Sequence, residues 1–242
     1  GSTATAAGPA VRLGLASIAG LPQAAAGRLQ AARAQRPFAS LADLATRARL
    51  QRRDLDLLAA AGALADLAGH RRQAAWAAAG VSLQLDLLHD APPPERTPDL
   101  AEPSEAENLI ADYASSGLSL GRHPLSLLRS RLTAQRFVTA RQLQAAADRQ
   151  LLRAAGIVTC RQRPGTASGI VFVTLEDETG LANIVVHSRL VERQRRELLG
   201  ARLLGVLGQV QREGEVVHLV AKRLVDLSAL LGRLPTTSRN FH

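Results

Sequence analysis

Side chains that could hold a metal ion are few and poorly grouped in this sequence. The densest group of carboxylates is Glu176, Asp177 and Glu178, which Thr179 and Gly180 follow. Consecutive side chains of a strand point to opposite faces, so these three carboxylates would not converge on one metal ion. The string favours a turn between two strands over a metal site.

The histidines and the single cysteine add no catalytic group. The six histidines are scattered without the spacing of metal ligands, and Cys160 has no basic neighbours beyond Arg161 that would mark a nucleophile. We therefore predict that this chain has no catalytic residues, no metal site and no cofactor of its own.

A candidate phosphate-binding hairpin lies near the start of the chain. Residues 18–33 resemble a helix-hairpin-helix motif, in which a Gly-apolar-Gly turn joins two helices and backbone N–H groups hold a DNA phosphate without reading sequence. Gly20 and Leu21 fit the turn, and Arg28 follows as a candidate DNA contact. Pro22 replaces the second glycine and has no N–H to donate. DNA binding and a purely structural role are both open for this hairpin.

A second, looser copy of the motif covers residues 44–64. Four arginines gather around its turn, and Arg49, Arg52 and Arg53 are the candidate DNA contacts. Arginine can bind phosphate through two parallel N–H groups. A solvated charged turn is the alternative. Paired motifs of this kind pack as one unit, so we expect a single helical domain over residues 10–80.

A short peptide after this domain resembles the motif by which bacterial DNA polymerases and repair proteins bind the sliding clamp. Gln84, Leu85, Leu87 and Leu88 follow its pattern, with Leu88 where an aromatic residue is usual. Such a peptide seats its side chains in a preformed pocket and must lie in an accessible linker. The alternative is an amphipathic segment that packs on the helical domain.

The elements that must position these residues change type along the chain. Apolar residues at three- and four-residue spacing predict a tandem helix-hairpin-helix module over 10–80. An acidic linker is expected over 81–150, with short helices over 125–132 and 140–147. β-Branched runs then predict five strands, with a helix over 188–199 between the third and fourth, which is the order of an OB-fold, over 151–225. The fold class is therefore α+β and multidomain, with a tag scar and disordered start at 1–9 and a tail at 226–242.

A basic loop is expected between the first two strands of this barrel. Arg161, Arg163 and Thr166 lie in it, at the rim where nucleic acid normally crosses an OB-fold. Phe172 is the only aromatic residue in the expected strands, so no stacking platform for bases is predicted. Binding would be electrostatic, salt-sensitive and without sequence preference. Surface decoration is the alternative.

Charge is unevenly distributed along the 242 residues. The net charge of +9 divides into +6 over 1–80, −2 over 81–150 and +5 over 151–242, and Lys222 is the only lysine. This balance favours a polyanionic partner, although GC-rich codon usage could explain the choice of arginine over lysine. Within the acidic section, Ser104 and Glu107 form a capping-box pattern that predicts the start of a helix.

Composition also bears on the compartment. One cysteine cannot form an internal disulfide, and no run of about 18 apolar residues could cross a bilayer. We expect a soluble cytoplasmic protein without membrane contact. The chain lacks methionine and begins with Gly1 and Ser2, which resemble the scar of a removed purification tag, so we expect a piece of a longer protein.

Several stretches together resemble one family, the bacterial C-family error-prone DNA polymerases, in their C-terminal region. The string Thr-Leu-Glu-Asp-Glu-Thr-Gly at 174–180 and the arginine-rich loop are the most specific, and Asn240 departs from the aspartate usual in the family's last residues. The stretches that carry the resemblance are 11–15, 37–44, 117–124, 161–166, 172–180 and 238–242.

The resemblance implies a parent enzyme that extends primers opposite damaged templates, a damage-inducible relative of the polymerase III alpha subunit. It implies a catalytic palm with Mg²⁺ outside this chain. The implied partners are primer-template DNA, the sliding clamp, and Y-family-like and RecA-like accessory proteins of a mutagenic complex. The chain itself would bind DNA without catalysis, or would instead act as a docking platform for those proteins.

Overall fold

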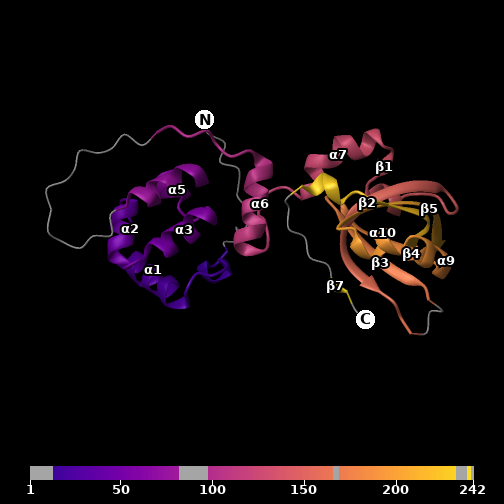
Figure 1. Cartoon of the computed structure of the whole chain (residues 1–242), viewed down its shortest axis with the longest axis horizontal. Coiled ribbons are helices and arrows are strands. Elements are labelled where there is room, and N and C mark those ends of the chain that lie inside the picture. Colours follow the sequence, from indigo (N-terminus) through magenta and orange to yellow (C-terminus); the bar gives the residue numbers. More distant parts are fainter. Residues whose placement is uncertain (1–12, 82–97, 166–168, 233–238, 241–242) are drawn as a thin grey trace, which may run out of the picture. The chain divides into compact units, whose positions relative to one another are not determined.

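The chain divides into two compact units in the computed structural model (Figure 1), which describes residues 13–81, 98–165, 169–232 and 239–240. The first unit is helical and comprises Gly1–Leu118. The second comprises Ser119–His242 and is built around a β-barrel. The division falls inside the section 81–150 that the sequence treats as one linker, and each unit is described by itself.

Short helices make up the first unit. The spacing of alanine and leucine places Leu55, Leu58 and Ala59 of one helix together in the core, and Ser40 starts another by accepting a hydrogen bond from the Asp43 amide. The predicted helical character of this region is confirmed. The elements are η1 (Leu15–Ser17), α1 (Gln23–Gln35), α2 (Leu41–Arg47), α3 (Arg52–Ala60), α4 (Ala65–Ala68), α5 (Arg71–Gly80) and α6 (Glu105–Ser116).

Helix α6 belongs to this unit although it lies in the acidic section of the sequence. The predicted capping box is present, because the Ser104 hydroxyl accepts from the Glu107 amide and the Glu107 carboxylate accepts from the Ser104 amide at 2.8 Å. Arg72 of α5 pairs with Glu107 at 2.5 Å, and Arg71 pairs with Asp112. Two acidic side chains of this section thus neutralise arginines of the helical unit.

The second unit combines short helices with a seven-stranded sheet among the described residues. Helices predicted over 125–132 and 140–147 are present as α7 and α8, and α8 ends three residues earlier than expected. The elements are α7 (Pro124–Ala134), β1 (Phe137–Val138), α8 (Ala140–Gln144), β2 (Leu151–Gln162), β3 (Val171–Asp177), β4 (Gly180–Val186), α9 (Ser188–Arg193), α10 (Arg195–Gly200), β5 (Leu203–Glu213), β6 (Val216–Asp226), η2 (Ser228–Leu231) and β7 (Arg239–Asn240).

Five of these strands close into a barrel. Their order is β2–β3–β4–β6–β5, and β5 pairs back with β2. β4 and β6 run parallel, whereas the other four pairs are antiparallel. Along the chain, α9 and α10 lie between β4 and β5, the third and fourth strands of the barrel. The predicted five-stranded OB-like barrel and the α+β class are confirmed. β1 and β7 add short parallel pairings to β2.

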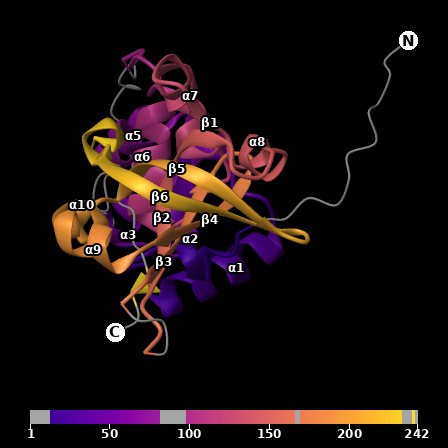
Figure 2. The same cartoon turned by 90° about the vertical axis from the view of Figure 1, so that its right-hand side faces the viewer.

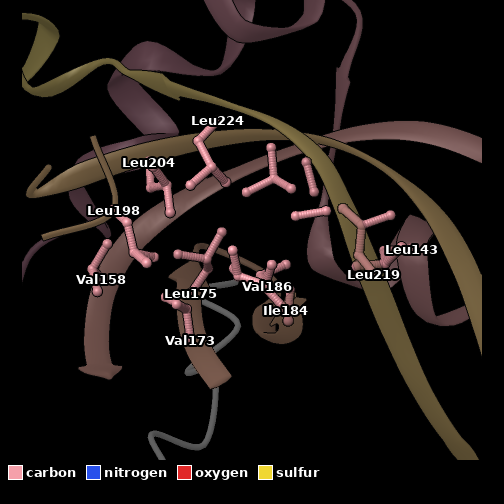
Figure 3. Packing of buried hydrophobic residues seen from close by; sticks show 14 of the residues in the cluster. Leu143, Val158, Val173, Leu175, Ile184, Val186, Leu198, Leu204, Leu219 and Leu224 are labelled. Atoms are coloured by element: carbon pink, nitrogen blue, oxygen red, sulfur yellow. The ribbon is translucent and has the colours of Figure 1, made fainter. Parts of the chain in front are cut away.

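Alternation along the strands fills the barrel interior. Val171, Val173 and Leu175 of β3 point inward, and the residues between them are half-buried. Figure 3 shows Leu143 of α8 and Leu198 of α10 meeting the inward side chains of the strands. The two helices therefore complete the apolar core.

The single helix expected over 188–199 is two helices. The break lies at Gln194, whose side chain is hydrogen-bonded to the backbone of β6: its Nε2 donates to the Leu224 carbonyl at 2.9 Å, and its Oε1 accepts from the Leu224 amide at 2.8 Å. The side-chain carboxamide of Gln194 thus bonds to the backbone of Leu224 in the way that a neighbouring strand would. This tertiary contact explains why local periodicity did not predict the break.

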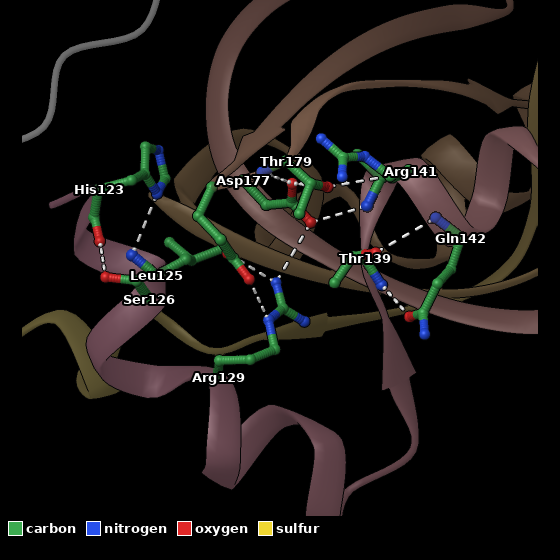
Figure 4. A network of polar contacts seen from close by, with 11 residues as sticks. His123, Leu125, Ser126, Arg129, Thr139, Arg141, Gln142, Asp177 and Thr179 are labelled. Atoms are coloured by element: carbon green, nitrogen blue, oxygen red, sulfur yellow. Dashed lines mark hydrogen bonds and ion pairs between the residues drawn. The ribbon is translucent and has the colours of Figure 1, made fainter.

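A buried polar junction joins α7 and α8 to the turn between β3 and β4 (Figure 4). The Asp177 carboxylate is 5% exposed and accepts hydrogen bonds from the Ala140 amide, and from the amide and hydroxyl of Thr179, each at 2.7 Å. Arg129 of α7 pairs with Glu178 at 2.9 Å and with Asp177 at 3.2 Å. The interpretation of this acidic string as a structural turn is confirmed.

His123 at the start of α7 makes the barrel sensitive to pH. Its Nδ1 accepts from the Leu125 amide at 3.1 Å, which requires an unprotonated nitrogen. Burial lowers the pKa of His123 below its ordinary 6.5, and the nearby carboxylates of Glu176, Glu178 and Asp177 oppose this effect only in part. The unfolded chain therefore binds more protons in this range than the folded one. The contribution to stability is complete above pH 6.5 and is lost as the pH falls through the lowered pKa.

We expect His123→Asn to remove this contribution to the pH dependence. The asparagine oxygen can cap α7 without titrating. Urea unfolding of both proteins, measured at a series of pH values from 7.5 down to about 5, where the ordinary histidine is mostly protonated, checks the expectation. Parallel stability curves for the two proteins across that range would contradict it.

Candidate nucleic-acid interface

The first hairpin has the geometry of a tight turn before a helix. Gly20 adopts a positive φ of 78°, and the Leu21 amide donates to the Ile18 carbonyl at 3.2 Å. Pro22 is the N-cap of α1, and its carbonyl accepts from the Ala25 amide at 3.0 Å. Proline here starts the helix and donates nothing. Phosphate contact at this turn would rest on the first amides of α1 and on neighbouring side chains.

The second hairpin brings its arginines beside the first. The turn between α2 and α3 places Arg49 at a positive φ of 48°, with an exposed side chain. Arg52 and Arg53 lie in the first turn of α3, and Arg52 pairs with Asp56 at 2.9 Å. Arg53 Nη2 lies 3.9 Å from the position that a Cβ on Gly20 would take. Gly20 and Arg53 therefore belong to one surface.

Arg28 holds the two hairpins together. Its Nε donates to the Ala48 carbonyl at 2.8 Å, and its Nη2 donates to the Arg49 carbonyl at 3.2 Å. Arg47 is likewise structural: it pairs with Asp43 at 3.1 Å and stacks on the Phe38 ring at 4.8 Å. Of the arginines around this turn, Arg49 and Arg53 are exposed and make no ion pair with any residue that the structure describes.

The placement of Arg161 in an exposed loop is wrong. Arg161 lies inside β2 and is 6% exposed. Its Nε donates to the Leu198 carbonyl at 2.7 Å, and its Nη2 donates to the Ala201 carbonyl. Burial lowers the pKa of its guanidinium. Arg161 fastens the end of α10 to the barrel, because the carbonyls that end a helix need donors from outside it.

Arg163 is the exposed arginine of this loop. Its Nη2 lies 3.7 Å from the position that a Cβ on Gly169 would take, and Ser188 at the start of α9 is 3.3 Å from that same position. Arg163 is thereby placed near α9. Thr166 lies outside the described residues, as does the clamp-like peptide with Gln84, Leu85, Leu87 and Leu88.

The described ranges contain neither a cluster of metal ligands nor a membrane-spanning helix. No three histidine, cysteine, aspartate or glutamate side chains there are grouped so that they could hold a metal ion. None of the helices described is long and apolar enough to cross a membrane.

Known proteins similar to this chain cover nearly all of it. A family model described as a helix-hairpin-helix motif matches residues 2–74. An error-prone DNA polymerase of Azoarcus sp. (strain BH72) is 68% identical over 97% of this chain. Proteins of the same name from Dechloromonas aromatica (strain RCB) and Ralstonia nicotianae are 65% and 57% identical over 96% and 97% of it. The resemblance to the error-prone DNA polymerases is confirmed.

The chain corresponds to one part of these error-prone DNA polymerases, since it spans 22%, 23% and 22% of the three relatives. Among solved structures, asparaginyl-tRNA synthetase from Pyrococcus horikoshii is similar over 38% of this chain and 23% of that chain, with 22% identity. Its TM-score of 0.33 is too low to bear on function.

Sequence reasoning passed over one set of exposed arginines. Arg189, Arg193, Arg195 and Arg196 are exposed on α9 and α10, while Leu190, Val191 and Leu198 of the same helices are buried in the barrel core. Helical spacing, with arginines between the apolar positions of 188–199, is the signal that could have revealed them.

Proposed function

We propose that this chain is the non-catalytic, nucleic-acid-binding part of an error-prone DNA polymerase. The observation that carries the proposal is the 68% identity to such a polymerase over 97% of the chain. The matched helix-hairpin-helix model and the OB-like barrel support it, because both architectures commonly bind nucleic acid.

The helical unit would hold duplex DNA by its phosphates. Gly20 and Arg53 share one surface, and Arg49 stands in the adjoining turn. Backbone amides and arginine forks bind phosphate irrespective of sequence, which suits a polymerase that must grip any primer-template. Leu21, Arg28 and Arg52 would serve the same surface by positioning it, since Arg28 already holds the carbonyls of the second hairpin.

The role of the parent enzyme is part of the proposal. It would extend primers across lesions in the cytoplasm during the response to DNA damage, with Mg²⁺ held by residues outside this chain. Y-family-like and RecA-like proteins and the sliding clamp would be its partners. Gln84 and Leu87 would be the central contacts to the clamp.

A second candidate function is a docking platform for those partner proteins with little DNA affinity. Two observations favour it: Pro22 has no amide to offer at the first hairpin, and Phe172 is the only aromatic residue in the strands of the barrel. Titration of the chain with primed and with single-stranded DNA across a salt series separates the two functions. Affinity that falls steeply with salt supports DNA binding, whereas no binding at low salt with co-elution of the accessory proteins supports docking.

Arg53→Gln should weaken duplex binding several-fold and reduce the slope of log K against log salt by about one, as expected for one lost phosphate contact. Arg33→Gln is the matched control, because Arg33 is also exposed and lies near the far end of α1. Fluorescence anisotropy of a labelled duplex measures both proteins. Equal losses for the two variants would count against the hairpin surface.

A further inference from the structure

A second basic surface covers α9, α10 and the adjoining part of β6. Its side chains are exposed, while Leu190, Val191 and Leu198 on the same helices are buried in the core. Figure 2 shows α9 and α10 next to each other at the side of the barrel, and both contact β6. We call this surface the basic strip, and its residues are Arg163, Arg189, Arg193, Arg195, Arg196, Lys222 and Arg223.

The charges of the basic strip are not neutralised locally. None of its side chains makes an ion pair or a hydrogen bond with any residue in the described ranges. Glu192 and Glu197 are the acidic residues on the same two helices, and neither pairs with a strip arginine there. Asp226, further along β6, accepts from Ser228 at 2.9 Å. Seven basic side chains thus lie among three acidic ones.

The strip is held rigidly by contacts that the sequence did not predict. Arg161 binds the carbonyls of Leu198 and Ala201 at the end of α10. Gln194 ties the junction of the two helices to Leu224, the residue next to Arg223. The helices therefore present their arginines from a fixed framework, which lowers the entropy lost on binding an extended ligand.

The strip continues to the loop between β2 and β3. The position of a Cβ on Gly169 is 3.7 Å from Arg163 Nη2 and 3.3 Å from Ser188, the residue before Arg189. Arg163 therefore lies close to the start of α9, where Arg189 is the second residue. We take Arg163 as one end of the basic strip.

We propose that the basic strip binds the sugar-phosphate backbone of a nucleic-acid strand, from Arg163 across α9 and α10 to Arg223. The inference deepens the proposed function and rests on it. Six of the seven side chains are arginines, which suit phosphate, and Leu199 is the only large apolar side chain exposed on the two helices. The central contacts of a protein partner are usually several apolar or aromatic side chains, whereas the two helices offer Leu199 alone.

The test compares two triple variants of the whole chain. The strip variant is Arg193→Gln, Arg195→Gln and Arg196→Gln. The control removes the same charge elsewhere in the barrel unit, at exposed side chains that make no ion pair or hydrogen bond with any described residue: Arg131→Gln, Arg136→Gln and Arg141→Gln. Anisotropy of labelled single-stranded and duplex oligonucleotides is measured across a salt series, and circular dichroism verifies that both variants fold.

We expect the strip variant to lose about tenfold in affinity at low salt and two to three in the slope of log K against log salt. The control should lose about twofold or less. Equal losses for the two variants would overturn the strip, while the proposed function would stand if Arg53→Gln still weakened binding. Binding of labelled polyglutamate, a model of an acidic protein, is measured in the same way. If the strip variant kept its DNA affinity but lost polyglutamate binding, the strip would be a site for an acidic protein and the proposal would be overturned. No DNA binding by the unsubstituted chain would overturn the proposed function itself.

Discussion

Asp177→Ala is expected to lower the free energy of unfolding of the barrel unit by about 3–5 kcal/mol. The Asp177 carboxylate is buried and accepts from the Ala140 amide and from Thr179, and it pairs with Arg129. Removal of the carboxylate leaves the buried Ala140 N–H without its acceptor. It also leaves the half-buried Arg129 guanidinium with Glu178 as its one remaining carboxylate partner. Because the same carboxylate joins α7, α8 and the β3–β4 turn, packing of both helices on the barrel should loosen together.

The neighbouring carboxylate supplies a matched control. Glu176 lies in the same string and is only half-buried, and its side chain makes no hydrogen bond with any residue in the described part of the chain. We expect Glu176→Ala to change stability by less than about 1 kcal/mol. Urea unfolding followed by circular dichroism measures both variants. Equal stability of the two would show that the junction contributes little.

An internal reference is available in the same experiment. The single tryptophan, Trp76, and the single tyrosine, Tyr113, both lie in the helical unit. Their fluorescence should report unfolding of that unit alone, and neither variant should move its midpoint. A shift of that midpoint would point to a global effect instead of a local one.

The elements that were predicted correctly are those that local sequence determines. Strand-length β-branched runs indicated the five barrel strands, and the Ser104 capping box indicated the start of α6 because its two hydrogen bonds lie within four residues. The parallel pairing of β7 with β2 and the break at Gln194 depend on residues far apart in the chain. No local pattern encodes such contacts, and neither was predicted.

The candidate site was predicted less well than the fold, for a related reason. Sequence shows that an arginine is charged, but it does not show whether the guanidinium faces solvent or binds carbonyls. Arg28 and Arg161 each donate to carbonyls at least twenty residues away, and Arg163, two residues from Arg161, is exposed. Net charge therefore predicts a polyanionic partner as a class of ligand, but it does not show which arginines are exposed to contact such a ligand.

Gly208→Ala is expected to lower the free energy of unfolding of the barrel unit by about 3 kcal/mol, because an added methyl group would overpack a closed core. A Cβ at this position of β5 would lie 2.5 Å from the Val220 carbonyl oxygen and 2.8 Å from Leu219 Cγ. Val220 is paired on both sides, with Val185 of β4 and with Gln209 of β5. Its carbonyl cannot withdraw without disturbing the ladders that close the barrel.

Gly200→Ala is the matched control for Gly208→Ala. Nothing lies within 4 Å of a Cβ at Gly200, the last residue of α10, so alanine there should be neutral or stabilise by up to about 1 kcal/mol. The two substitutions add the same methyl group and reduce the freedom of the unfolded chain alike, so their difference in urea midpoint isolates the close approach of β5 and β6. Equal midpoints would contradict the prediction. They would mean that β5 and β6 can move apart at Gly208 and admit the methyl group at little cost in stability.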